Sequence, residues 1–290
     1  MASLKDIRRR ISSVQSIQQV TKAMKMVAAA KLHRAQMNML RARPYANRIR
    51  NVLYSLLPQI DRELLPVLQV RPQVQRYLAV VVTSDRGMAG GFNTNVLKHA
   101  ESRINELGKD RVDIIGIGRK GREHFAKREY NVVSSHIDFW SELNFHHAMT
   151  FGSEIISRYI EGQVDEVTVF FNQFKNIMVQ ELREEQLLPL VIEEGEEIET
   201  TEVVFEPSMA EVVNRLVPRH LNIQIWRYLL ESYASEQAAR MTAMDNATQN
   251  AEEVIESLQR EYNKARQASI TKEILDIVGG AEALRAEALE

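Results

Sequence analysis

The feature that most constrains the fold is a long stretch without chain breakers. From Arg219 to Val278 the sequence contains neither glycine nor proline. These two residues most disfavour a helix interior, so an uninterrupted helix is the simplest structure for this stretch. Its length of about sixty residues corresponds to roughly 90 Å, much longer than an ordinary globular helix. Gly279 and Gly280 follow it and predict its end.

A shorter helix is expected just before this stretch. Ser208 and Glu211, in "EPSMAE", have the spacing of a capping box. Pro218 should end that helix, because proline is tolerated at a helix start but breaks an interior.

The N-terminal region predicts a second long helix. Ser3 and Asp6 resemble a capping box, and no proline occurs before Pro44. Apolar residues recur at steps of three and four: Leu4, Ile7, Ile11, Val14, Ile17, Val20, Met24, Val27 or Ala28, Leu32, Ala35 and Met39. This pattern is one stripe of a helix of about 40 residues, roughly 60 Å long, with further helix to about Leu57. A linker is then marked by Pro58, Pro66 and Pro72.

The two long helices should pair, because neither narrow stripe can be buried by its own helix. If the middle of the chain returns near its entry point, the helices run antiparallel and form a coiled coil. One partner helix does not cover the Lys- and Arg-lined first helix. We therefore expect the pair to lie inside a larger assembly.

The middle of the chain has a different composition, since ten of the twelve glycines lie between Gly87 and Gly195. Strands are predicted at 77–83, 112–118, 130–137, 165–174 and 176–191, and helices at 94–107, 122–129 and 146–161. This alternation implies a mostly parallel sheet with helices on its faces. The predicted fold class is α/β with long terminal helices: an antiparallel coiled coil of the N- and C-terminal helices plus a Rossmann-like half-domain. The expected parts are an N-terminal coiled-coil helix (1–58), a linker (59–76), a Rossmann-like α/β domain (77–206) and a C-terminal coiled-coil helix (207–290).

Composition excludes several classes of site. The 290 residues include no cysteine, which removes disulfides, thiolate metal sites and cysteine nucleophiles. No apolar run approaches the roughly 18 residues of a membrane-spanning helix. The net charge of −2 hides an asymmetry: residues 1–50 carry 12 Lys and Arg against one acid, and residues 181–211 carry 11 Glu and one Arg.

The motif "GIGRKG", residues 116–121, is an uninterrupted G-x-G-x-x-G between a strand-like and a helix-prone run. A dinucleotide pyrophosphate binds in this context, and Asp138 lies at about the right separation for a ribose contact. However, the motif follows the second predicted strand instead of the first, no acid–base pair accompanies it, and the region of about 115 residues leaves no room for a substrate domain. A tight strand-to-helix turn is favoured, and we expect no cofactor. An oxidoreductase using Gly116, Gly118 and Gly121 remains the alternative.

Other chemical candidates are weak. The turn "TSDRGMAGGFNTN", 83–95, could cradle an anion with Asp85 and Arg86, but it lacks the Walker pattern. A structured turn in which Asn93 caps the next helix is favoured. His146 and His147 are adjacent and point in different directions on a helix, so no metal site is expected. No catalytic triad is found, and no catalytic residue is predicted.

The basic N-terminal helix permits three interpretations: a solvated face, a surface for an acidic protein partner, or a nucleic-acid site. No aromatic residue precedes Tyr45, so stacking on single strands is unsupported. A coiled-coil scaffold that binds nucleic acid is therefore only a second alternative, and we expect no nucleic-acid partner.

Five segments resemble the gamma subunit family of rotary ATP synthases. They are "QVTKAMKMVAAAKL" (19–32), "VTSDRGMAGGFN" (82–93), "ASEQAARMTAMDNAT" (234–248), "YNKARQASITKEI" (262–274) and "ITKEILDIVGGAEAL" (270–284). The resemblance spans nearly the whole chain. It implies a non-catalytic central-stalk rotor of a proton-translocating ATP synthase, which transmits torque between the membrane c-ring and the catalytic alpha/beta hexamer. The absence of cysteine and of an inserted regulatory segment separates the chain from chloroplast-type members and suggests a bacterial type.

The resemblance also implies partners and contact residues. The partners would be the alpha and beta subunits, the epsilon subunit and the c-ring, with indirect, peripheral membrane association at the cytoplasmic face of the plasma membrane. Arg266 and Gln267 match positions that hold a loop of one beta subunit, and Thr271 matches a polar position that supports this contact. The family methionine near the beta-subunit lever corresponds to Met24, and acidic beta-subunit segments would pass Lys31 and Arg34.

Overall fold

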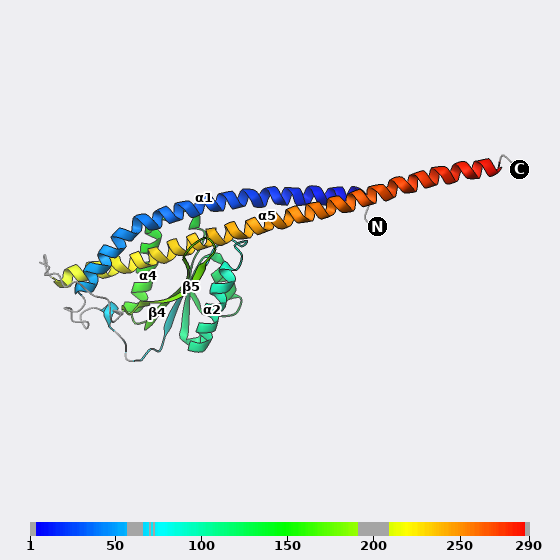
Figure 1. Ribbon diagram of the computed structural model, residues 1–290. Coiled ribbons are helices and arrows are strands. Elements are labelled where there is room, and N and C mark those ends of the chain that lie inside the picture. The colour runs from blue at the N-terminus through cyan, green and yellow to red at the C-terminus, as the bar shows by residue number, and fades with distance from the viewer. Residues whose placement is uncertain (1–3, 57–65, 70, 72, 191–208, 288–290) are drawn as a thin grey trace. The chain divides into compact units, whose positions relative to one another are not determined.

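The computed structural model describes residues 4–56, 66–69, 71, 73–190 and 209–287. The chain forms two compact units. We call Met1–Val27 with Ala243–Glu290 the helical unit, and Ala28–Thr242 the sheet unit. Two long helices, α1 (Leu4–Leu56) and α5 (Met209–Glu287), each contribute to both units (Figure 1).

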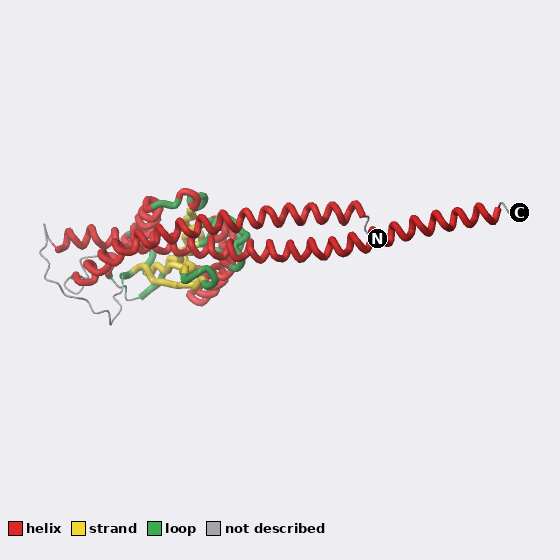
Figure 2. The backbone as a smooth tube through the Cα atoms, turned by 45° about the horizontal axis from the view of Figure 1, so that its top comes forward, coloured by secondary structure: helices red, strands yellow, loops and turns green. Residues whose placement is uncertain are grey.

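In the helical unit, α1 and α5 lie side by side and run antiparallel (Figures 1 and 2). Two contacts show this direction. The Lys25 ammonium lies 2.6 Å from Asp245, and the Arg8 guanidinium lies 2.7 Å from the Tyr262 hydroxyl, so residue numbers fall along α1 while they rise along α5. Ile7 is buried to 2% exposure. The antiparallel pair predicted from the two sequence stripes is therefore present.

The buried face of α1 differs from the predicted stripe at two positions. Ile17 and Val20 are 55% and 57% exposed, whereas Thr21 is 8% exposed. The Thr21 hydroxyl lies 2.8 Å from the Thr248 hydroxyl of α5 and donates to the Gln18 carbonyl at 3.0 Å. Since its polar group is satisfied, the threonine is buried at little cost, and two large apolar side chains remain exposed.

The sheet unit contains five strands in the order β3-β2-β1-β4-β5. Four are parallel, namely β1 (Tyr77–Val82), β2 (Val112–Ile117), β3 (Val132–His136) and β4 (Glu166–Phe174), and β5 (Gln180–Leu188) is antiparallel to β4. The connecting helices are α2 (Phe92–Leu107), α3 (Arg119–Ala126) and α4 (Phe145–Ile160). Short 3-10 helices span Pro66–Leu68, Lys109–Arg111 and Trp140–Glu142. The predicted α/β fold class is confirmed.

Both faces of this sheet are covered, because alternate residues of each strand point to opposite sides. One face packs against α2 and α3 through a cluster that includes Val81, Val96 and Phe125. The other face packs against α4 and against the parts of α1 and α5 in the same unit; its members include Val80, Phe151, Leu53 and Leu229. Strands buried on both sides explain the apolar runs that predicted a parallel sheet.

The expected helix break at Pro218 is wrong, since this residue lies inside α5. An interior proline costs about 3 kcal/mol because it lacks a donor and crowds the preceding turn. Val213, Val217 and Leu221 beside it are 0% exposed in the core of the sheet unit. Each such burial is worth about 1.5–3 kcal/mol, so packing offsets the cost of the proline. In the same way, Pro44 lies inside α1.

The expected end of α5 at Gly279 and Gly280 is also wrong, since the helix continues to Glu287. A glycine lowers helix stability by about 1 kcal/mol relative to alanine, but it ends a helix by adopting positive φ. Neither glycine does so. The proposed caps at Ser3 and Ser208, and Pro58 and Pro72 of the expected linker, lie outside the described residues.

Candidate functional site

The glycine motif at 116–121 forms the turn from β2 into α3, as predicted. The first N–H groups of α3 are bonded within the chain: Arg119 N–H donates to Asp85 Oδ1 at 2.8 Å, and Gly121 N–H donates to Thr83 Oγ1 at 2.8 Å. The N–H of Lys120 donates to the Ser84 carbonyl at 3.1 Å. These are the donors that would hold a pyrophosphate. The carboxylate of Asp85 thus supplies the anion from within the protein.

The same carboxylate also binds the residue expected to contact a ribose. Asp85 Oδ2 accepts from the N–H of Asp138 at 2.8 Å, and the Asp138 side chain pairs with Arg119. Gly118 leaves no space beside the turn, because a Cβ there would lie 2.1 Å from the Thr83 carbonyl oxygen. The motif is therefore a close-packed turn and not a cofactor cradle.

Asn93 does not cap α2 as predicted, because the helix begins after Gly91. Instead, its side-chain oxygen accepts from the N–H of Ser84 at 3.0 Å, and its amide donates to the Ser84 hydroxyl at 2.8 Å. The amide group stabilises the turn that precedes the helix, an alternative use of asparagine that competes with capping.

This turn is also fixed to α5 within the sheet unit. The Arg240 guanidinium donates to the carbonyl of Gly87 at 3.2 Å and to Glu236 at 2.6 Å. The Arg240 and Glu236 side chains are 11% and 6% exposed. Burial raises the pKa of Glu236, and Arg240 opposes this shift. The Ser235 hydroxyl adds a contact to the carbonyl of Asn172 in β4 at 3.0 Å.

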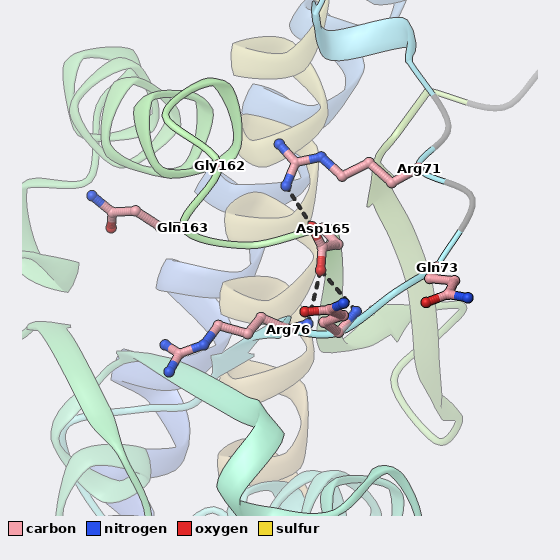
Figure 3. A pocket seen from close by; sticks show the side chains of 7 residues that line it. Arg71, Gln73, Arg76, Gly162, Gln163 and Asp165 are labelled. Carbon is pink, nitrogen blue, oxygen red and sulfur yellow. Dashed lines mark hydrogen bonds and ion pairs between the residues drawn. The ribbon is translucent and has the colours of Figure 1, made fainter.

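A concave surface that encloses a volume of about 530 Å³ lies at the amino-terminal ends of β1 and β4 (Figure 3). It is lined by Arg71, Gln73, Gln75, Arg76, Gly162, Gln163 and Asp165. Ligands of open α/β sheets bind at the opposite, carboxyl ends of the strands.

Asp165 explains why these residues gather there. Its carboxylate accepts from the N–H groups of Gln75 and Arg76, at 2.8 and 2.9 Å, and pairs with Arg71. Burial would raise the pKa of Asp165, but these hydrogen bonds together lower it. Arg71 also donates to the Tyr159 carbonyl at 2.8 Å. Asp165 thus anchors the segment that enters β1.

Three of the seven histidines contact neighbouring residues of the fold. Asn144 and His147 form a capping box at the start of α4, which the sequence analysis missed. His124 pairs with Glu101, and His136 with Glu154, each at 2.9 Å. Within the ranges that the structure describes, no three His, Asp or Glu residues gather as a metal site would require.

The end of α5 carries an exposed apolar surface in the helical unit. The helix continues past the start of α1 (Figure 1), beyond the contact between Arg8 and Tyr262. Five apolar side chains are 48–71% exposed there: Ile270, Ile274, Leu275, Ile277 and Val278. This patch was not predicted from the sequence, although the run "ILDIV" (274–278), which lies beyond the reach of the first helix, could have indicated it. None of the helices described is both long enough and apolar enough to cross a lipid bilayer.

Comparison with known proteins agrees with this architecture. The family model described as ATP synthase matches residues 3–284. The ATP synthase gamma chain of Chlorobaculum parvum is 48% identical over 291 residues, which covers 98% of this chain and 100% of the relative. The chain belongs to the ATP synthase gamma chain family.

Two solved structures share the fold of this chain. One comes from the OSCP/F1/c-ring assembly of Euglena gracilis mitochondrial ATP synthase, with a TM-score of 0.70 and 20% identity over 98% of this chain and 95% of that one. The other comes from the central stalk and c-ring of the Tetrahymena thermophila mitochondrial enzyme, with a TM-score of 0.61 and 22% identity over 79% of this chain and 99% of that one. As a gamma chain, the protein is a non-catalytic subunit of an enzyme that couples proton transport to ATP synthesis.

The six partner-binding positions predicted for this gamma chain do not form one cluster. Arg266, Gln267 and Thr271 are exposed on successive turns of α5, and Met24 is half-buried on α1. Met24 precedes Lys25, which pairs with Asp245 of α5. Asp245 and Arg266 are 21 residues apart on α5, which corresponds to roughly 30 Å of helix.

The other two positions, Lys31 and Arg34, lie on α1 in the sheet unit, half-buried and exposed respectively. The six positions therefore lie on two helices and in two units, and their role in partner binding stays a prediction.

Proposed function

We propose that this gamma chain is the central-stalk rotor of its ATP synthase. In this proposal the paired helices lie within the ring of alpha and beta subunits, and the sheet unit contacts the epsilon subunit and the c-ring. The complex is attached at the cytoplasmic face of the plasma membrane, so the chain itself is a peripheral component. The four-part division at residues 58, 76 and 206 remains a prediction within this proposal.

The observation that carries the proposal is the exposed apolar end of α5. An isolated helix with Ile274, Leu275 and Ile277 in water loses the hydrophobic free energy that burial would give it. A surrounding sleeve of partner subunits would bury these side chains without needing polar bonds of fixed register. Such a contact holds an axle while it lets the axle turn.

Polar residues that precede or lie within this apolar end of α5 would provide hydrogen bonds of defined direction to a beta subunit. The Arg266 guanidinium can bind a carboxylate with two parallel hydrogen bonds, and the Gln267 amide can bind a backbone group of the same loop. Thr271 lies one turn further on and would support that contact. These side chains are exposed in the chain and thus available to a beta subunit.

On α1, the exposed apolar residues and the cations have complementary roles. Ile17, Val20 and Val27 are more than half exposed beside Met24 and suit an apolar lever surface. Further along the helix, Lys31 and Arg34 would attract acidic segments of the beta subunits. This attraction acts over about 8 Å at physiological salt.

Torque follows from the asymmetry of these surfaces. At each angle the shaft presents a different face to each beta subunit, and the difference in contact free energy favours a different conformation. Rotation then changes which catalytic site is open. Conversely, a conformational change driven by nucleotide binding changes the preferred angle of the shaft.

The proposal is tested first by co-assembly with partner subunits, and then by the rates of ATP hydrolysis and rotation of the assembled complex. The full chain, co-expressed with alpha and beta subunits of the same enzyme, should co-purify with them, and failure to co-assemble would refute the proposal. In the assembled complex, the double variant Arg266→Ala/Gln267→Ala should lower ATP hydrolysis about ten-fold, equivalent to about 1.4 kcal/mol, with assembly retained.

The matched control is Asn263→Ala/Lys264→Ala, which removes two exposed polar side chains one turn earlier on the same helix. It should leave hydrolysis within two-fold of the wild type. Equal rates of rotation for the two double variants would contradict the roles assigned to Arg266 and Gln267.

A further inference from the structure

Four arginines form an exposed basic surface on the parts of α1 and α5 that belong to the sheet unit. On α1, Arg41 and Arg48 lie on either side of Tyr45 at helical spacings of four and three, so the three side chains share one side of the helix. On α5, Arg215 and Arg219 are one turn apart and share a side in the same way. We call these five residues the arginine face.

Tyr45 joins the two halves of this face. The Arg219 guanidinium of α5 lies over the Tyr45 ring of α1, 5.4 Å from the ring centroid, in a cation–π contact. The tyrosine is 44% exposed, and Val52, two turns further along the same side of α1, is 43% exposed. The arginine face therefore combines cations with an exposed aromatic ring and borders on an exposed aliphatic side chain.

The positive charge of the arginine face is not balanced by the helices that carry it. No Asp or Glu occurs in residues 7–56 of α1 or in residues 212–230 of α5. Within the parts of the chain that the structure describes, none of the four arginines forms an ion pair. By contrast, the half-buried Arg227 of α5 pairs with Glu185. Like charges one helical turn apart repel each other, so an anion that binds here would relieve this repulsion.

We propose that the arginine face binds the phosphate groups of anionic phospholipids at the surface of a bilayer. Each guanidinium can donate two parallel hydrogen bonds to one phosphate, and it keeps its charge at physiological pH. Tyr45 suits the same place, because tyrosine favours the boundary between lipid and water. The proposal rests on the proposed function, since contact between the sheet unit and the c-ring brings this face near a membrane. It adds a direct lipid contact to the indirect association.

A bilayer fits this face better than a nucleic acid does. Domains that bind nucleic acids are strongly basic as a whole, whereas this chain has a net charge of −2. The potential of an anionic membrane falls off within about 8 Å at physiological salt, so it acts on the local face and not on the net charge of the chain. A cluster of about four to eight basic residues is typical of surfaces that recognise anionic lipids.

Binding is measured by co-sedimentation of the full-length chain with two kinds of vesicle. One kind contains phosphatidylcholine alone, and the other contains equal parts of phosphatidylcholine and phosphatidylglycerol. The chain should bind the anionic vesicles about a hundred-fold more tightly, because each arginine near an anionic surface contributes about five-fold. Raising the salt from about 0.1 M to about 1 M should remove this preference, since the screening length falls from about 10 Å to about 3 Å.

A pair of double variants tests whether the arginine face is responsible. Arg41→Gln/Arg48→Gln should lower the affinity for anionic vesicles by about 25-fold, the product of two five-fold losses. The matched control is Lys98→Gln/Lys127→Gln, which removes the same charge from two exposed side chains at α2 and at the end of α3. These two helices cover the other face of the sheet, so the control should change the affinity by less than about two-fold.

Further variants locate the contact on the two helices. Arg215→Gln/Arg219→Gln should reproduce the loss, because half of the arginine face lies on α5. Arg43→Gln removes an exposed arginine that is two residues from Arg41 and therefore points to another side of α1. It should change the affinity by less than about two-fold, whereas Arg41→Gln should lower it by about five-fold.

Four results would overturn the assignment. They are equal affinity for the two kinds of vesicle, equal losses in the first double variant and its control, tighter binding of a DNA duplex than of anionic vesicles at the same salt, and loss of vesicle binding once alpha and beta subunits have assembled around the chain. The last result would show that a protein partner covers the face. Because the first assay uses the chain alone, its failure is distinct from a failure to co-assemble, which would refute the proposed function.

Discussion

Gly118→Ala tests the idea that the glycine motif serves packing alone. Gly118 has φ of +94° and ψ of 148°, a region that only glycine populates readily. An added Cβ would lie 2.1 Å from the carbonyl oxygen and 2.6 Å from the carbonyl carbon of Thr83. Both atoms belong to the backbone at the end of β1, so relief requires the strand or the turn to move.

The magnitude follows from two costs. The backbone conformation costs an alanine about 1–3 kcal/mol. Displacing the Thr83 backbone also weakens the bond from Thr83 N–H to the Ile117 carbonyl, now 2.7 Å, which adds about 1 kcal/mol. We therefore expect Gly118→Ala to destabilise the sheet unit by about 3 kcal/mol, a decrease in Tm of about 6–12 °C.

Two other glycines provide matched controls. Gly90 has φ of +54° with nothing within 4 Å of an added Cβ, so Gly90→Ala has the conformational cost alone, about 1 kcal/mol. Gly87 has neither positive φ nor a close neighbour, and Gly87→Ala should be neutral or slightly stabilising. The assay is thermal and urea unfolding of the full chain. A Tm for Gly118→Ala within 2 °C of that for Gly87→Ala would refute the packing argument.

Two further predictions concern polar side chains of the sheet unit. Asp85→Ala removes the acceptor for the N–H groups of Arg119 and Asp138 and should cost about 2 kcal/mol in urea unfolding, with Asp85→Asn less harmful because its amide oxygen can still accept. Burial first, and then the cations Arg50 and Arg227, lower the pKa of His220 from 6.5 to about 4. Because the unfolded chain binds this proton more readily, stability should be lost as the pH falls from 6.5 towards 4, by about 3 kcal/mol in all. His220→Gln should flatten that part of the stability profile, and an unchanged profile would contradict the burial argument.

The features predicted correctly from the sequence depend on patterns among residues that are close together in the chain. Apolar runs predicted the strands at 77–83 and 112–118, and the alternation of strand-like and helix-like segments predicted the other three. The scarcity of glycine outside the middle of the chain predicted two long helices. The helix ends were less predictable. Pro218 and Gly279 are strong local signals, yet tertiary packing outweighs the proline, and the glycine has a helical conformation.

The missed features depend on residues far apart in the sequence. Asp85 and Arg119 are 34 positions apart, and Thr21 and Thr248 are 227 apart. No periodicity could show that a threonine replaces Ile17 or Val20 in the buried stripe, because the choice depends on a hydroxyl of the opposite helix.

The G-x-G-x-x-G turn shows how one backbone geometry can have either of two uses. The start of a helix needs an anion or another acceptor for its free N–H groups, and a bound phosphate or an internal carboxylate can supply it. Here Asp85 is the internal acceptor, and the turn that carries it also contacts Arg240 of α5 through Gly87. A bound phosphate can dissociate, whereas a carboxylate on the same chain cannot. An internal carboxylate therefore keeps the first N–H group of α3 bonded without any ligand.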